Sequence, residues 1–290
     1  MKTIKLFGYL GVAVLVISLF SCSNVKTEDV AVSSDGVNIR FEKKGWKKPA
    51  VIFIHGWTNP RTIWEDQVEY FSKDYTAVAL DLAGSGKSGH DRKNWTINAF
   101  SDDVIAVMDK LSLDKVILVG FSMGAMVAVE TANRVPNRIL GVVNVDELKN
   151  PGMKIPEEMM NTMVDNYMAL VTSGFTNENL VAGGFYKRNE EMAFKKLSEM
   201  YDNVSHIGWK ESLENALKWM NESQKASLQG LKVPYVGIFS DSEPVEIDSI
   251  KALVPTFKAD IVANTGHLVF WDDPEGFNTL LEKDIKEFVE

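Results

Sequence analysis

The chain has 290 residues, of which 45% are hydrophobic and 24% are charged, and it carries a formal net charge of −9. This length and composition are typical of one large globular domain with an insertion. The acidic balance argues against binding to nucleic acid and against electrostatic docking on anionic lipid.

The N-terminal segment has the features of a secretion signal. Two lysines precede an apolar run that ends at Phe20 and is about 15 residues long, shorter than the roughly 20 needed to span a bilayer. The run leads into Leu19-Phe-Ser-Cys22, which resembles a bacterial lipobox, the motif whose cysteine is acylated and becomes the mature N-terminus. We therefore expect residues 1–21 to be a lipoprotein signal peptide and residues 22–29 to be a tether. The mature protein would be lipid-anchored in the cell envelope, facing the periplasm.

Strand and helix patterns alternate after the tether. The expected buried strands are Ala50–Ile54, Tyr75–Leu80, the run after Lys115, Ile139–Val145, Pro234–Phe239 and Ala259–Val262. A hairpin that begins at Val30 precedes them, and amphipathic helices separate most of them, the last beginning at Pro274. This alternation predicts a mostly parallel sheet with helices on both faces.

Residues 147–230 interrupt that alternation. They contain apolar residues at helical spacing, no run typical of a buried strand, and eight of the twelve methionines. We expect them to form a helical cap over the carboxyl ends of the strands, where open α/β sheets bind ligands. The core would then consist of residues 30–146 and 231–290.

One serine lies between a buried strand and a helix. Gly120-Phe-Ser122-Met-Gly124 joins the apolar run after Lys115 to a second apolar run with no intervening loop. This is the G-x-S-x-G nucleophile elbow in its required strand–turn–helix context. The tight turn needs Gly120 and Gly124, because a side chain at either would collide with neighbouring backbone. We expect it to expose the Ser122 hydroxyl and to point the Met123 N–H at the group that Ser122 attacks.

A serine nucleophile needs a base and an acid that orients the base. Of the four histidines, His267 follows the last expected strand, at the same sheet edge as Ser122, and the chain order serine, acid, histidine suits this arrangement. His55 precedes an expected buried turn, His90 lies in a polar loop, and His206 lies in the cap. His267 is therefore the expected base.

These motifs together resemble the α/β-hydrolase superfamily, in its cap-bearing branch, over about residues 30–290. The matching pieces are His55-Gly-Trp57, Asp81-x-x-Gly-x-Gly-x-Ser88, Gly120-Phe-Ser-Met-Gly124 and Gly266-His267. The resemblance implies a second oxyanion-hole N–H from Trp57 beside that of Met123. The branch that dehalogenates or opens epoxides uses aspartate at the elbow, so serine disfavours those reactions.

Three carboxylates compete for the role of the acid. Asp241 and Glu243 follow the Pro234–Phe239 strand, where the superfamily most often keeps its acid, and Asp146 ends the strand after the elbow, a position that some members use. Asp241 is our preferred candidate because its side chain is short and has few rotamers to freeze. Asp146 and Glu243 remain alternatives.

The sequence thus predicts a serine hydrolase that cleaves a small-molecule carboxylic ester with an apolar portion and needs no cofactor. A low-turnover ligand receptor with a retained triad, or a C–C hydrolase or perhydrolase on the same scaffold, is the alternative. No spacing typical of a metal site occurs in the sequence.

Overall fold

The computed structural model describes residues 26–201 and 205–290. The expectations about the signal peptide and Cys22 lie outside the described residues. Within these two ranges no helix is long and apolar enough to cross a membrane.

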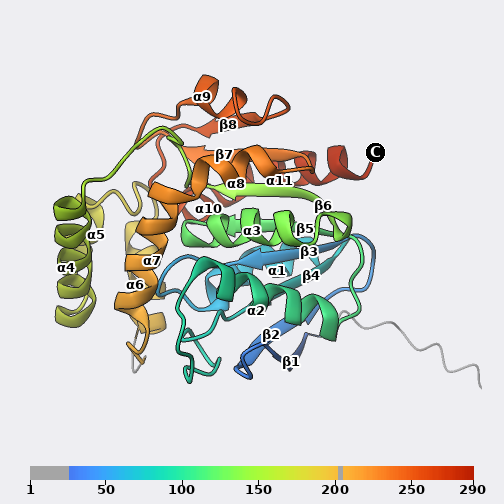
Figure 1. Ribbon diagram of the computed structural model, residues 1–290, viewed down its shortest axis with the longest axis horizontal. Coiled ribbons are helices and arrows are strands. Elements are labelled where there is room, and N and C mark those ends of the chain that lie inside the picture. Colours follow the sequence, from blue (N-terminus) through green and yellow to red (C-terminus); the bar gives the residue numbers. More distant parts are fainter. Residues whose placement is uncertain (1–25, 202–204) are drawn as a thin grey trace, which may run out of the picture.

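An eight-stranded sheet runs through the centre of the molecule (Figure 1). Its strands are β1 (Thr27–Val32), β2 (Asn38–Lys44), β3 (Ala50–Ile54), β4 (Thr76–Leu80), β5 (Val116–Phe121), β6 (Ile139–Val145), β7 (Tyr235–Ser240) and β8 (Lys258–Val262). They are ordered β1-β2-β4-β3-β5-β6-β7-β8. The hairpin strand β2 pairs antiparallel with both β1 and β4, and β3 to β8 pair parallel with one another, which confirms the predicted fold class.

Helices cover both faces of the sheet because its central strands are apolar on both sides. All five residues of β3 are buried, and alternate residues belong to two separate cores: Ile52 and Ile54 to one, Val51 and Phe53 to the other. The first core includes α2 (Ile97–Lys110) and α3 (Met123–Arg134), and the second includes α1 (Glu65–Phe71) and α11 (Pro274–Val289).

The chain from β6 to β7 is helical, and its described residues include no strand. Its helices are α4 (Glu157–Ser173), α5 (Asn177–Ala182), α6 (Glu190–Tyr201), α7 (Trp209–Glu222) and α8 (Gln224–Gly230). In Figure 1, α4 to α7 stand beside one end of the sheet, whereas α8 lies along it next to α3. We call α4 to α7 with their connecting segments the cap helices. The remaining elements are short: η1 (Arg61–Trp64), η2 (Pro136–Arg138), α9 (Ile247–Lys251) and α10 (Val269–Asp272).

Contacts place the cap helices against the carboxyl ends of the strands. The Trp57 indole N–H, just past the end of β3, donates to the Trp209 carbonyl at 2.9 Å. Thr58 and Asn59 both hydrogen-bond the phenol oxygen of Tyr201, at 2.7 and 2.9 Å. The cap helices therefore cover the sheet edge at which β5 ends and Ser122 begins its turn.

Candidate active site

Ser122 occupies the strained turn that the elbow motif requires. It follows β5, caps the N-terminus of α3, and has φ 51° and ψ −126°, a conformation that residues other than glycine rarely adopt. Such backbone strain costs on the order of 1–3 kcal/mol and persists only where the surroundings impose it. Here the Ser122 N–H donates to the Val145 carbonyl at 3.1 Å, which ties the turn to the neighbouring strand.

The two glycines of the elbow have the steric role expected from the sequence. A Cβ at Gly120 would lie 2.3 Å from the Gly124 carbonyl oxygen, and a Cβ at Gly124 would lie 2.4 Å from the Ile54 carbonyl oxygen. Both neighbours are backbone atoms that no rotamer change can move. Any larger residue at either position would therefore displace a strand or open the turn.

The segment after β3 lies against the nucleophile turn. A Cβ at Gly56 would be 3.1 Å from Ser122 Cβ, which brings the adjoining backbone N–H of Trp57 close to the turn. The Met123 N–H belongs to the first turn of α3, where an N–H has no intrahelical acceptor. The two backbone groups expected to hold an oxyanion thus flank the serine.

The His55 side chain holds this segment in place through hydrogen bonds. Our sequence analysis assigned it no role. The buried imidazole accepts the Leu82 N–H on Nε2 at 2.9 Å and contacts the Gly56 carbonyl through Nδ1 at 2.7 Å. Burial lowers the pKa of His55, so the ring is neutral with its proton on Nδ1. His55 links the end of β3 to the end of β4. In the sequence, the only indication of this role is that His55 directly precedes an expected buried turn.

His267 lies beside the elbow and bonds to Asp146. Its ring centroid is 4.6 Å from that of Phe121, the residue before Ser122. Its Nδ1 lies 2.8 Å from Oδ2 of Asp146, which is 3% exposed and directly follows β6. Burial works to raise the pKa of Asp146, but the His267 hydrogen bond and the charges of His267 and Lys149 hold it below its ordinary value. An ionised Asp146 accepts only, so His267 carries its proton on Nδ1 and leaves Nε2 free to accept another.

Asp241 does not contact His267, which corrects our preferred choice of acid. Its Oδ1 accepts the Lys187 ammonium at 2.7 Å and the Thr265 N–H at 3.2 Å, and its Oδ2 accepts the Asn264 N–H at 2.8 Å. The Lys187 hydrogen bond is the main reason that the pKa of Asp241 falls to about 2. Asp241 therefore supports the loop that carries His267 but does not reach its imidazole.

Glu243 does not reach His267 either. Its side chain is 74% exposed and lies 3.6 Å from the Lys149 ammonium. A carboxylate so exposed gains little from one ion pair. Of the three candidates, Asp146 alone contacts the expected base.

A segment of the cap helices holds the His267 backbone, which the sequence did not reveal. The N–H of His267 donates to the Gly184 carbonyl at 2.8 Å, and the N–H of Leu268 donates to the Phe185 carbonyl at 2.7 Å. The Asp272 carboxylate accepts the N–H groups of Gly266, Lys187 and Arg188 at 2.6 to 2.8 Å. One buried carboxylate thus joins the His267 loop to the segment between α5 and α6.

The Ser122 hydroxyl donates to Glu147 rather than to His267. Its Oγ lies 3.4 Å from Glu147 Oε2, a long hydrogen bond. Glu147 directly follows Asp146, and our sequence analysis assigned it no role. Rotation about one Ser122 torsion would turn the hydroxyl away from Glu147.

Two further features bear on what else the molecule could bind. In residues 26–201 and 205–290, no group of three or more His, Asp or Glu side chains could hold a metal ion.

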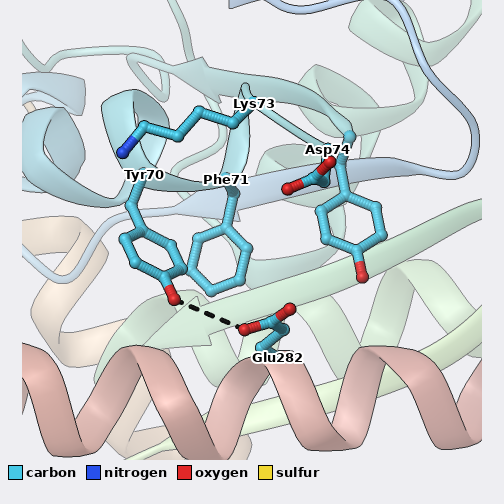
Figure 2. A pocket seen from close by; sticks show the side chains of 6 residues that line it. Tyr70, Phe71, Lys73, Asp74 and Glu282 are labelled. Carbon is cyan, nitrogen blue, oxygen red and sulfur yellow. Dashed lines mark hydrogen bonds between the residues drawn. The ribbon is translucent and has the colours of Figure 1, made fainter.

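A crevice of about 260 Å³ lies between the end of α1 and α11, lined by Tyr70, Phe71, Lys73, Asp74, Tyr75 and Glu282 (Figure 2). It shares no residue with the site around Ser122.

Comparison with known proteins places this geometry in a family. Residues 49–274 match the family described as the alpha/beta hydrolase fold. N-formylmaleamate deformylase of Pseudomonas putida is 26% identical over 254 residues, which cover 85% of this chain and 92% of the relative. Epoxide hydrolase 2 of Siraitia grosvenorii is 30% identical over 156 residues, 52% of this chain and 46% of that protein.

Solved structures agree on the fold. A thermophilic esterase from Thermogutta terrifontis superimposes with a TM-score of 0.76 at 20% identity, over 90% of this chain and 99% of the esterase. The named relatives thus include an esterase, an epoxide hydrolase and a deformylase. The chain belongs to the α/β-hydrolase family.

Proposed function

We propose that the protein is a serine hydrolase that cleaves a carboxylic ester with an apolar portion through an acyl-enzyme on Ser122. The observation that carries the proposal is the hydrogen bond of 2.8 Å between His267 and Asp146, beside a serine on a strained elbow. It fixes the imidazole tautomer that accepts a proton on Nε2, as a general base must.

In the proposed reaction, Ser122 rotates toward His267 and attacks the ester carbonyl as Nε2 takes its proton. The Trp57 and Met123 N–H groups stabilise the oxyanion, and Asp146 stabilises the imidazolium. The imidazolium returns the proton to the departing alcohol. Water, activated by the same imidazole, then releases the acid and restores Ser122. Apart from the ester and the water, every group in this reaction belongs to the protein.

The apolar portion is inferred from the lining of the cap helices. Ile155, Val164, Leu213 and Leu217 form a buried cluster, and Met160, Met163, Met168, Met220 and Trp57 pack against it. Methionine side chains adapt to irregular apolar shapes. Because Trp57 also flanks Ser122, this cluster continues to the nucleophile.

Burst kinetics with a 4-nitrophenyl ester test the proposal. Wild type should release one equivalent of nitrophenol rapidly and then turn over, whereas Ser122→Ala and His267→Ala should do neither. A burst without turnover would favour a ligand receptor that keeps the triad. Turnover that survives Ser122→Ala would refute the acyl-enzyme on this serine.

We also propose that the protein is tethered to the membrane through an acylated Cys22. The apolar run and the Leu19-Phe-Ser-Cys22 sequence support this proposal. Wild type should incorporate a fatty-acid analogue, and Cys22→Ser should not. Incorporation that persists in Cys22→Ser would refute lipidation at this position.

A further inference from the structure

Glu147 brings a second carboxyl group to the nucleophile. Besides the Ser122 hydroxyl at 3.4 Å, it accepts only the Leu148 N–H, on Oε1 at 3.3 Å, among the described residues. Its backbone bonds to the Asn144 side chain, and its two sequence neighbours, Asp146 and Leu148, have φ of 56° and 53°. A departure from ordinary backbone geometry therefore lies on each side of the residue that points at Ser122.

Among residues 26–201 and 205–290, no cation forms an ion pair with this carboxyl. The Lys149 ammonium lies 3.1 Å from Asp146 and 3.6 Å from Glu243, and no described Lys, Arg or His nitrogen lies within 4.0 Å of Glu147. A partly buried carboxyl without a counter-ion favours its protonated form, and a cation brought close from outside would favour its ionised form. Burial raises the pKa of Glu147, as the charge of Asp146 does, while His267 and Lys149 oppose the rise.

The aromatic side chains of Trp57 and Tyr167 pack together next to the segment that lies against Ser122. Trp57, which flanks Ser122, is fixed by indole hydrogen bonds to the Trp209 carbonyl and Ser212 Oγ, at 2.9 and 3.1 Å. The Tyr167 ring meets the Trp57 ring edge-on, with centroids 5.8 Å apart. Burial raises the pKa of Tyr167, and the charge of Glu147 raises it further. Tyr167 is 37% exposed, so the group of rings reaches solvent.

We propose that Glu147 selects substrates with an ammonium group, which it pairs with its carboxylate while the rings of Trp57 and Tyr167 contact the methyl or methylene groups around the nitrogen. Aromatic faces and a carboxylate together are the chemistry that recognises alkylammonium ions. The inference rests on the proposed ester hydrolysis and narrows its substrate to an ester with a cationic acyl or alcohol part. The ammonium is unchanged in the reaction: the Ser122 Oγ–acyl bond forms, the ester C–O bond breaks, and the alcohol leaves with the proton from His267.

Two pairs of isosteric esters test this selection on wild type. One pair compares 2-trimethylammonioethyl acetate with 3,3-dimethylbutyl acetate, and the other compares the 4-nitrophenyl esters of 4-trimethylammoniobutanoate and 5,5-dimethylhexanoate. After division by the hydroxide-catalysed rates, kcat/KM should favour the cationic member of at least one pair by about 10-fold or more, as one desolvated cation contact supplies. A ratio near one, or below one, in both pairs would overturn the inference.

Glu147→Gln keeps the shape of the side chain and removes its charge. The cationic preference should fall to about one in this variant, whereas Glu243→Gln, which removes an exposed charge nearby, should retain it. In wild type the preference should rise with pH through the pKa of Glu147, because only the ionised carboxyl attracts the cation. The titratable groups that interact electrostatically with it are Asp146, His267, Lys149, Tyr167 and Tyr235. A preference that survives Glu147→Gln would overturn the assignment to this residue.

Binding of tetramethylammonium to wild type, measured by calorimetry, gives a readout that needs neither turnover nor a folded variant. Tetramethylammonium should bind more tightly than tert-butanol, its neutral counterpart in size. Turnover of 4-nitrophenyl acetate without any of these cationic effects would refute the inference and leave the proposed hydrolysis intact. Cation binding without burst or turnover would refute the hydrolysis and leave the cation site.

Discussion

Replacement of Asp146 by asparagine tests the proposed site most directly. Oδ1 of Asp146 accepts two donors, the Ser240 N–H at 2.7 Å and the Lys149 ammonium at 3.1 Å, while Oδ2 accepts His267 at 2.8 Å. The asparagine oxygen should remain with the two donors, so its NH2 group turns to His267. Two donors cannot share a hydrogen bond, and the imidazole therefore moves its proton from Nδ1 to Nε2.

This exchange of tautomers removes the base rather than weakening it. A protonated Nε2 cannot take the Ser122 proton, and loss of the orienting acid in this way lowers kcat by about 10⁴ in serine hydrolases with a triad. That factor corresponds to about 5.5 kcal/mol in the activation free energy. Ser122→Ala and His267→Ala should lose about 10⁶, because they remove the reacting groups themselves.

The assay is steady-state hydrolysis of a 4-nitrophenyl ester by wild type and by Asp146→Asn, Asp241→Asn and Glu243→Gln. We expect Asp241→Asn to lose less than about 10-fold, because Asp241 acts on the His267 loop and not on the ring, and Glu243→Gln to match wild type. A collapse in Asp241→Asn with Asp146→Asn near wild type would refute the reasoning. If none of the three variants loses activity while Ser122→Ala is inactive, a serine–histidine dyad replaces the triad.

Three predictions concern stability. Burial lowers the pKa of His55 in the folded state, so the stability that the neutral side chain contributes is present above the unfolded pKa of about 6.5 and is lost as pH falls below it. Tm should therefore drop from pH 7 to pH 5, and it should drop less steeply in His55→Gln. Burial and the charge of Asp260 raise the pKa of Asp284 to about 7, so the folded state loses stability as pH rises from about 4 to 7. Asp284→Asn should therefore raise Tm by several degrees at pH 8 but hardly at pH 4, and an equal gain at both would contradict the titration. Gly124→Ala should lower Tm far more than Gly152→Ala, because the new Cβ would lie 2.4 Å from a backbone oxygen in the first case and 3.5 Å from a side-chain atom in the second.

The fold and the nucleophile turn could be predicted because their signals are local. The run after Lys115, the two elbow glycines and Ser122 adjoin in sequence, so the motif is visible there even though the Ile54 carbonyl that excludes a side chain at Gly124 lies far away in the chain. The alternation that predicted the parallel sheet is likewise a short-range pattern.

The carboxylate that bonds His267 could not be identified from the sequence, because its identity depends on where the loops after two neighbouring strands place their side chains. β6 and β7 are neighbours in the sheet, so Asp146 and Asp241 emerge at the same edge. Asp241 does not reach His267 because its carboxylate accepts hydrogen bonds from the N–H groups of Asn264 and Thr265 and from the ammonium of Lys187, 54 residues earlier. Glu147 was missed for a similar reason, since only the turn between Asp146 and Leu148 directs its side chain to Ser122.

The hydrogen bonds from His267 and Leu268 to Gly184 and Phe185 bear on how this enzyme could be re-engineered. The proposed base takes its position from the same inserted segment that covers the proposed nucleophile, so one structural part would serve both specificity and catalysis. Exchange of the insertion with that of a relative would preserve activity, and so allow a new substrate range, only if the new segment placed two carbonyls where those of Gly184 and Phe185 lie. A library that varies residues on α4 and leaves 184–188 untouched should therefore contain far more active variants than one that shuffles whole insertions.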